Sequence, residues 1–410
     1  MATPYVTFVL VGFLDLLSIF FILPYLANHA KELGFNHIQV GIIEAIFRGC
    51  QLISSPIVGS LSDVRGRKPI FLLCLIICSF AYFSLGITSS ILGFLGIRVI
   101  IGTFEHTQTL TRALAPDYID DENDVTALYG KLTSLGGLGM ALGPVLGGYV
   151  MGVFPENGFT IMCTALSAFI ILNAGLISSL PDIKKETKDK SEKALRSTNL
   201  FDPIVNTYNQ LVNNLYNLDW AIYGDIFLFK ILMSLSMGLY LNNFHLFLKT
   251  EHDVSPSVLG YITTFQGIGS SITNEKVSSL NKRYVNDRDY SQRIFHIFLI
   301  MVLSLTGLAV VPAIPFYIAL LIPTVVCFAF ARVVALVVLS NRSITSNRGT
   351  LIGAFNSVSS ISDIVTPIIG GIINHYLGVT YVFYTGAMIA SIGVVLSYRA
   401  RLISLREKTK

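Results

Sequence analysis

Apolar runs long enough to cross a bilayer recur along the whole chain, and this feature restricts the possible folds more than any other. A transmembrane helix needs about 20 predominantly apolar residues, and about twelve such runs occur in these 410 residues. They cover residues 5–27, 38–60, 69–90, 91–113, 127–154, 158–180, 221–247, 256–278, 293–311, 314–338, 350–374 and 379–400. Only 13% of the residues are charged, whereas soluble domains contain about 25%. The sequence therefore predicts an all-α, multi-pass membrane protein with twelve transmembrane helices.

Lysine and arginine residues between the runs predict the orientation of the helices. Cytoplasmic loops of membrane proteins carry an excess of these residues. With the N-terminus on the cytoplasmic side, the segments on that side contain 22 of them, and the opposite side contains only Lys31 and Lys249. We therefore expect both termini to be cytoplasmic. Either the plasma membrane or an organellar membrane is compatible with this pattern.

A polar stretch at residues 181–219 divides the twelve runs into two sets of six. Its start is rich in Lys, Glu and Ser, which is typical of a flexible linker. We therefore expect an N-terminal six-helix bundle (residues 1–180), a cytoplasmic linker (181–219), a C-terminal six-helix bundle (220–400) and a cytoplasmic tail (401–410).

The two halves also repeat each other. Four small or helix-bending residues of the fifth run recur 223 residues later in the eleventh: Gly130, Pro144, Gly147 and Gly148 correspond to Gly353, Pro367, Gly370 and Gly371. A repeat of six spans is typical of secondary transporters. The sequence therefore predicts two pseudo-symmetric bundles with a pathway between them.

A short charged turn lies between the second and third runs. It reads Gly59-Ser60-Leu61-Ser62-Asp63-Val64-Arg65-Gly66-Arg67-Lys68-Pro69. Its two glycines permit a sharp turn at little steric cost, and its three basic residues favour the cytoplasmic side. The simpler interpretation is a topological anchor. The alternative is a gate, in which Asp63 binds the N-terminus of the eleventh helix near Arg348 and latches the transporter closed. The predicted gating residues are Gly59, Asp63, Arg65, Gly66, Arg67 and Lys68.

This turn resembles the G-x-L-x-D-x-x-G-R-[RK] signature of the major facilitator superfamily, although Val64 stands where the family usually has Arg. A second resemblance lies in the fifth run, whose G-x8-G-x3-G-P-x2-G-G spacing is similar to a motif of drug/proton antiporters of the tetracycline-efflux type. Its residues are Gly130, Gly139, Gly143, Pro144, Gly147 and Gly148. Close packing of two helices at small residues is the simpler interpretation of this spacing. The resemblance implies a transporter whose helices 1, 4, 7 and 10 line a central pathway.

Ionisable residues inside apolar runs are costly and often functional. Most of those in this chain fall on runs 1, 4, 7 and 10, the pathway helices of the resembled fold. We expect the proton and substrate pathway to include Asp15, Arg98, Glu105, His106, Asp225, Lys230 and Arg332.

Asp15 lies in the middle of the first run and resembles the acidic residue of helix 1 in tetracycline-efflux-like transporters, where it contributes to proton-coupled exchange. An unpaired carboxylic acid at mid-membrane is largely protonated, as a proton carrier requires. The structural alternative is a salt bridge to Arg332 or Lys230. In the second run, Glu44 and Arg48 are four residues apart and are expected to neutralise each other.

In the fourth run, Arg98, Glu105 and Arg112 are spaced seven residues apart. On a continuous helix this spacing places all three on one face. Glu105 and the adjacent His106 are candidates for binding and releasing a proton, because histidine titrates near neutral pH. The alternative is a structural pair of Glu105 with one of the two arginines, with His106 only hydrogen-bonded.

The predicted function is secondary active transport of a small organic solute by alternating access, with proton coupling and antiport favoured. The alternative is a facilitative or non-transporting protein that serves as a transporter-shaped receptor or scaffold. The expected partners are the solute, protons and the lipid bilayer, and we expect a monomer. An enzyme is not expected, because neither a phosphate-binding G-x4-G-K loop nor an H-E-x-x-H motif occurs. We expect no cofactor, metal or nucleic-acid partner.

Overall fold

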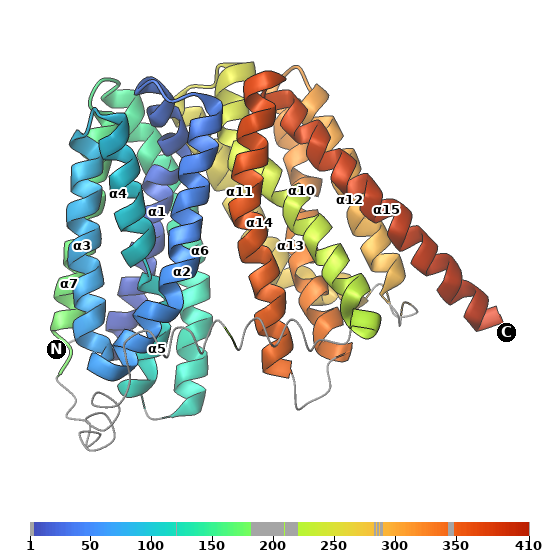
Figure 1. Cartoon of the computed structure of the whole chain (residues 1–410), viewed down its shortest axis with the longest axis horizontal. Coiled ribbons are helices and arrows are strands. Elements are labelled where there is room, and N and C mark those ends of the chain that lie inside the picture. The colour runs from blue at the N-terminus through green and yellow to red at the C-terminus, as the bar shows by residue number, and fades with distance from the viewer. Residues whose placement is uncertain are drawn as a thin grey trace. The chain divides into compact units, whose positions relative to one another are not determined.

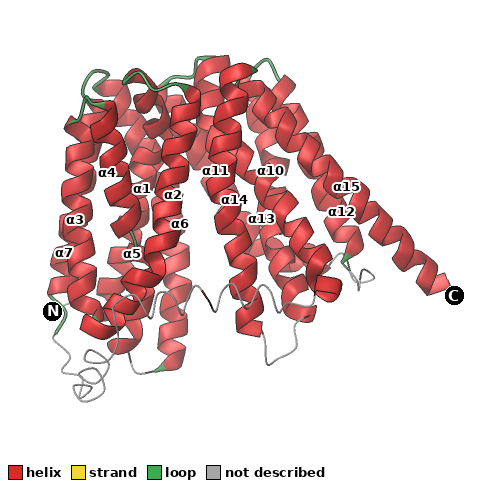
Figure 2. Cartoon of the chain, viewed as in Figure 1, coloured by secondary structure: helices red, strands yellow, loops and turns green. Residues whose placement is uncertain are grey.

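The computed structural model describes residues 4–119, 121–181, 220–282, 290–342 and 348–409, together with residues 209, 284 and 287. The predicted linker at 181–219 lies almost entirely outside these residues. Throughout the described part of the chain the structure consists of helices and short turns, with no strand (Figure 2). The predicted all-α fold is confirmed.

Figure 1 shows the helices, coloured in their order along the chain. They are α1 (Pro4–Glu32), α2 (His37–Arg65), α3 (Arg67–Ile87), α4 (Ile91–Phe104), α5 (Thr107–Leu114), the 3-10 turn η1 (Ala115–Asp117), α6 (Glu122–Val153), α7 (Gly158–Ser178), α10 (Trp220–His252), α11 (Pro256–Lys282), α12 (Ser291–Val310), α13 (Ile314–Arg342), α14 (Arg348–Tyr376) and α15 (Val379–Thr409). Each predicted run corresponds to one long helix, except run 91–113, which is divided between α4 and α5. In the described residues, ten helices are long and apolar enough to cross a membrane individually.

Two compact units make up the chain. The first contains residues 1–35, 46–210 and 255–264, and the second contains the remaining residues, 36–45, 211–254 and 265–410. Helix α2 therefore begins in the second unit and continues into the first, whereas α11 begins in the first unit and continues into the second.

In the first unit, α1 packs along α6 and α3 packs along α7. Glycines allow the close approach of α1 and α6, because a Cβ atom added at Gly139 or Gly143 would lie 2.7 or 2.8 Å from backbone atoms of α1. Between α3 and α7, the buried hydroxyls of Ser79 and Ser167 hydrogen-bond with an Oγ–Oγ distance of 2.8 Å. Close backbone approach and interhelical hydrogen bonds are what hold helices together in a membrane.

In the second unit, α10 packs against α14 and α15, and α12 packs against α13 and α15. Aromatic side chains fill the core between them. Tyr240, Phe247, Tyr317 and Phe383 are fully buried, and the rings of Phe247 and Phe383 stack with their centroids 4.5 Å apart. Aromatic rings that stack in this way contribute more than their buried area alone.

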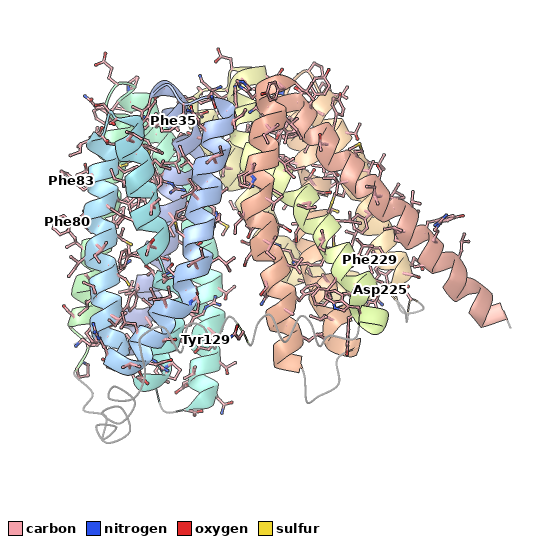
Figure 3. The ribbon with its side chains drawn as sticks, viewed as in Figure 1. Phe35, Phe80, Phe83, Tyr129, Asp225 and Phe229 are labelled. Carbon is pink, nitrogen blue, oxygen red and sulfur yellow. The ribbon has the colours of Figure 1, made fainter. Side chains whose placement is uncertain are left out.

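Large apolar side chains also cover the outside of the helices. Phe80 and Phe83 of α3 are 69% and 42% exposed, and Figure 3 shows both at the outer side of that helix. A soluble protein rarely exposes apolar surface over so many neighbouring helices. The outward-facing side chains therefore fit contact with lipid.

Candidate functional site

The fourth predicted span contains a break inside the first unit. Helix α4 ends at Phe104 and α5 begins at Thr107. Between them, Glu105 has φ −78° and ψ 80°, and His106 has φ −123° and ψ 23°, so neither residue is helical. The prediction of one continuous helix over 91–113 is therefore wrong. The argument that Arg98, Glu105 and Arg112 share one face fails with it: Arg98 is buried, whereas Arg112 is exposed.

Side chains of α2 satisfy the backbone groups that the break leaves without helical partners. Inside a membrane, such groups need partners within the protein. The Nε2 atom of Gln51 donates to the Glu105 carbonyl at 3.1 Å, and the Ser54 hydroxyl lies 3.4 Å from the Gly102 carbonyl. Gln51 and Ser54 were missed in the sequence analysis. The available signal was two polar residues three apart in an apolar run that also contains Glu44 and Arg48.

His106 is buried at the break and is held from two sides. Its Nε2 atom lies 2.8 Å from the Ser54 Oγ atom, and the tautomer of the ring decides which of these two atoms is the donor. On its other side, the ring is close enough to the backbone of Thr103 to interact with it.

Asp15 of α1 lies at the start of α5. Its side chain is buried, with 5% exposed, and its Oδ2 atom accepts a hydrogen bond from Gln108 Nε2 at 2.7 Å. The Thr107 side chain is a second donor to this carboxyl group. Both donors belong to the first turn of α5, where a helix favours negative charge. The break in the fourth span thus creates a helix N-terminus beside Asp15.

Glu105 lies at the break itself and is close enough to Asp15 for the two carboxyl groups to interact electrostatically. Its Oε2 atom accepts a hydrogen bond from the Tyr82 hydroxyl of α3 at 3.0 Å. Arg98 also acts electrostatically on Glu105, and its guanidinium carbon lies 4.0 Å from the centre of the Phe47 ring. The first unit therefore brings together four of the predicted pathway residues: Asp15, Arg98, Glu105 and His106.

The second unit brings together Lys230 and Arg332. The Lys230 Nζ atom lies 5.0 Å from the centre of the Phe355 ring, and Arg332 Nη2 donates to the Ser270 hydroxyl at 3.0 Å. Lys230 interacts electrostatically with both Arg332 and Asp363, which adds Asp363 of α14 to this group. Asp225 is exposed near the start of α10, where its carboxylate accepts a hydrogen bond from the Ile226 amide at 2.8 Å.

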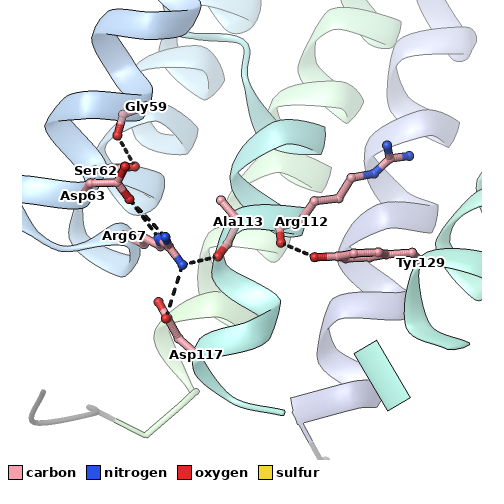
Figure 4. A network of polar contacts seen from close by, with 8 residues as sticks. All are labelled: Gly59, Ser62, Asp63, Arg67, Arg112, Ala113, Asp117 and Tyr129. Carbon is pink, nitrogen blue, oxygen red and sulfur yellow. Dashed lines mark hydrogen bonds and ion pairs between the residues drawn. The ribbon is translucent and has the colours of Figure 1, made fainter. Parts of the chain in front are cut away.

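The predicted gating turn joins α2 to α3 at Gly66, whose φ of 100° favours glycine. Figure 4 shows the network around Arg67. This side chain donates to Asp63 Oδ1 at 3.1 Å, to the Ala113 carbonyl at 2.6 Å and to Asp117 Oδ1 at 3.3 Å. The network therefore ties the turn to the end of α5. The proposed latch between Asp63 and the start of α14 stays a prediction.

The other basic side chains of the turn differ in their contacts. Lys68 Nζ donates to the Leu180 carbonyl at 2.6 Å and so links α3 to the end of α7, whereas Arg65 is exposed. Gly59 has no neighbouring atom within 4 Å of an added Cβ, so close packing does not require a glycine there.

The glycines of the antiporter-type motif face different surroundings. Gly139, Gly143 and Gly147 lie against the backbone of α1, and Gly148 faces the start of α11 at Pro256. At Pro144, the carbonyl accepts a hydrogen bond from the Tyr25 hydroxyl at 2.9 Å. Gly130, in contrast, has no neighbouring atom within 4 Å of an added Cβ. The geometry of the three inner glycines fits the helix-packing interpretation of the motif.

Long helices with outward-facing apolar surfaces and buried charges define a multi-pass membrane protein. The family model of the Major Facilitator Superfamily matches residues 8–228 and 226–410. The chain therefore belongs to this superfamily, as its charged turn predicted.

Similar known proteins and a similar solved structure support this assignment. Solute carrier family 22 member 18 of Rattus norvegicus is 23% identical over 95% of this chain and 92% of the relative. The class D tetracycline resistance protein of Salmonella ordonez is 30% identical over 47% of this chain and 49% of that protein. The crystal structure of the nucleoside transporter NupG matches with a TM-score of 0.75, at 13% identity, over 97% of this chain and 98% of that chain.

These similarities bear on four predictions. The chain is a multi-pass integral membrane protein, and it is a transporter rather than an enzyme. Its similarity to tetracycline resistance proteins agrees with the predicted drug-efflux-like branch. Secondary transport is the activity that the family and the fold support.

Proposed function

We propose that this protein exchanges a small organic solute for protons by alternating access, and that Asp15 is the proton-carrying residue. The observation that carries this proposal is the environment of its carboxyl group. Asp15 is buried in α1, and among the described residues its hydrogen-bond partners are the neutral side chains of Gln108 and Thr107. A carboxyl group held in this way can gain or lose a proton without breaking an ion pair.

Glu105 extends the proposed proton site. Two carboxylates that interact at close range resist being ionised together, and Glu105 interacts with Asp15. The neutral Tyr82 hydroxyl is its hydrogen-bond donor. We therefore assign the pair a shared proton in one state of the transport cycle. His106, which exchanges a hydrogen bond with Ser54, is the next candidate in this chain of groups.

The proposal also includes the orientation and the moving parts. We place both termini in the cytoplasm because of the asymmetry in Lys and Arg, and we take residues 1–180 and 220–400 as the two bundles that move during transport. Residues 181–219 and 401–410 are then cytoplasmic. The names of the tetracycline resistance relatives favour export of the solute, and proton entry would drive export by antiport. We propose a monomer as the transporting unit.

Proteoliposomes with an imposed pH gradient test this proposal. Tetracycline is the first probe, because it appears in the names of several relatives, and an enclosed pH-sensitive dye reports proton movement. We expect the Asp15→Asn variant to lose pH-driven transport and to retain exchange of labelled for unlabelled solute. The variant is nearly isosteric, and Asp124→Asn, at an exposed position of α6, is the matched control. Full pH-driven transport by Asp15→Asn would exclude Asp15 as the proton carrier.

A second candidate is a transporter-shaped receptor that binds a ligand without turnover. The observation in its favour is the sequence Asn281-Lys282-Arg283, at the corresponding place in the second half of the chain, which lacks the Gly and Asp of the first-half turn. A gate present in only one half fits a protein that no longer cycles. Saturable ligand binding without flux of ligand or protons in the same proteoliposomes would support this candidate and contradict transport.

A further inference from the structure

Two basic side chains of the second unit have no acidic partner within ion-pair distance. Lys230 of α10 lies over the neutral Phe355 ring, and Arg332 of α13 donates to the neutral Ser270 hydroxyl. Among the residues that the structure describes, no carboxylate oxygen comes within 4 Å of either cation. Asp363 acts on Lys230 only from beyond that distance. Two positive charges and one negative charge leave this group with a net charge of about +1.

Both cations belong to the membrane-crossing part of their helices. Lys230 is ten residues from the start of α10 at Trp220, and Arg332 is ten residues from the end of α13 at Arg342. At 1.5 Å per residue, each lies about 15 Å from that helix end. A charge facing lipid at such a depth is costly, so ionisable residues there face a water-filled path or a partner. The exposed Arg332 side chain therefore marks a water-accessible face of α13.

The chemistry of this group suits a compact anion. Arginine presents a planar set of donors that matches a carboxylate or phosphate, and lysine adds a point charge. The Ser270 hydroxyl accepts from Arg332 and, in the described structure, makes no other hydrogen bond. Its own proton is therefore available to donate to a ligand. Three hydrogen-bond donors on three helices therefore have the chemistry to bind an anion, and among the described residues no carboxylate lies within ion-pair distance of the two cations.

We propose that Lys230, Arg332 and Ser270 form an anion-binding site, and that the transported solute carries a carboxylate or another compact anionic group. This inference rests on the proposed transport function and names the class of its solute. Asp363 limits the positive charge of the site, so that one anionic group completes it.

Cysteine modification tests the site without knowledge of the natural solute. The full chain carries Ser270→Cys together with Cys50→Ser, which removes the one native cysteine that is not fully buried. Permeabilised membranes are treated with an anionic or a cationic methanethiosulfonate. The rate at which each reagent modifies the introduced cysteine is divided by the rate at which the same reagent modifies a free thiol in solution. Unit charges a few ångströms apart in a water-like medium change such a ratio about tenfold. We expect the anionic reagent to be favoured by about this factor.

Variants in the same background identify the source of the preference. Arg332→Gln and Lys230→Gln are each expected to reduce the preference several-fold, and Arg332→Lys is expected to retain most of it. The control is Lys249→Gln, because Lys249 is exposed and paired with Asp253 at 3.2 Å. Benzoate is expected to slow the reaction of the cysteine, whereas neutral benzamide has no effect. Size-exclusion profiles verify that each variant folds.

Several results would overturn the anion site. They are an unreactive thiol in the Ser270→Cys variant, equal relative rates for the two reagents, or a preference that Arg332→Gln and Lys230→Gln leave unchanged. The measurement does not depend on turnover. Charge preference with benzoate protection, but without pH-driven transport, would support the site and refute the proposed function. Normal pH-driven transport together with equal relative rates for the two reagents would support the proposed function and refute the anion site.

Discussion

Replacing Gly143 of α6 by alanine tests the packing of α1 against α6. An added Cβ at this position would lie 2.8 Å from the Phe20 carbonyl carbon, 2.8 Å from the Phe21 nitrogen and 2.9 Å from the Leu17 oxygen. Non-bonded carbon atoms prefer separations of about 3.5–4.0 Å. All three neighbours are backbone atoms, which no rotamer change can move. Helices α1 and α6 must therefore separate to accept the methyl group.

The expected cost follows from two opposing terms. Overpacking a well-packed contact costs about 1–3 kcal/mol, and replacing a helical glycine by alanine returns about 0.5–1 kcal/mol. We therefore expect Gly143→Ala to lower the free energy of unfolding by about 0.5–2 kcal/mol. Gly130→Ala in the same helix is the matched control. No atom lies within 4 Å of its added Cβ, so only the propensity term remains, and stability should rise by about 0.5–1 kcal/mol.

Equilibrium unfolding in mixed micelles of mild detergent and dodecyl sulfate measures both changes. The two variants have the same chemistry, belong to the same sequence motif and are predicted to shift the unfolding midpoint in opposite directions. If Gly143→Ala is as stable as Gly130→Ala, the close approach of α1 and α6 is wrong. A destabilised Gly130→Ala would show instead that this position has a neighbour outside the described contacts.

Three further predictions concern the turn, the orientation and the helix break. Arg67→Lys keeps the charge but loses the three-way contact with Asp63, Ala113 and Asp117, so the same unfolding assay should show a lower midpoint. The control Arg65→Lys, at an exposed position, should leave the midpoint unchanged. The sequon Asn341-Arg342-Ser343 should carry no glycan if both termini are cytoplasmic, and a glycosidase-sensitive mass shift would reverse the proposed orientation. Ser54→Ala should lower the free energy of unfolding by about 1–3 kcal/mol, because it leaves a buried polar partner unsatisfied. The double variant with His106→Ala should lose clearly less stability than the sum of the two single variants, and simple additivity would refute the contact between the two side chains.

The membrane-crossing helices could be predicted from hydropathy because the bilayer fixes a minimum apolar length. Their ends could not. Helix α15 continues to Thr409, although its apolar run ends near residue 400, and α6 begins at Glu122, five residues before its run. Outside the hydrocarbon region a helix no longer needs apolar residues, so hydropathy carries no information about where it stops.

The break in the fourth span shows a stronger limit. Neither Glu105 nor His106 is a residue that interrupts a helix by itself, as Pro does. The interruption is compensated by Gln51 and Ser54, which lie about 50 residues earlier in the chain. Residue spacing within one apolar run cannot predict partners that belong to another helix. Arg98, Glu105 and His106 could be singled out from the sequence as ionisable residues of one apolar run, but their arrangement depends on α2.

Neutral hydrogen-bond partners are the common feature of the two sites that we propose. Asp15 is held by Gln108, Glu105 by Tyr82, and Arg332 by Ser270. Removing one member of a buried ion pair costs about 3–5 kcal/mol because the other charge is left uncompensated. A site whose charge changes in every cycle, by a proton or by a bound anion, avoids this cost when its fixed partners are neutral. The gating turn follows the opposite rule: there, Asp63 and Arg67 form an ion pair, as expected of a structure whose charge stays constant.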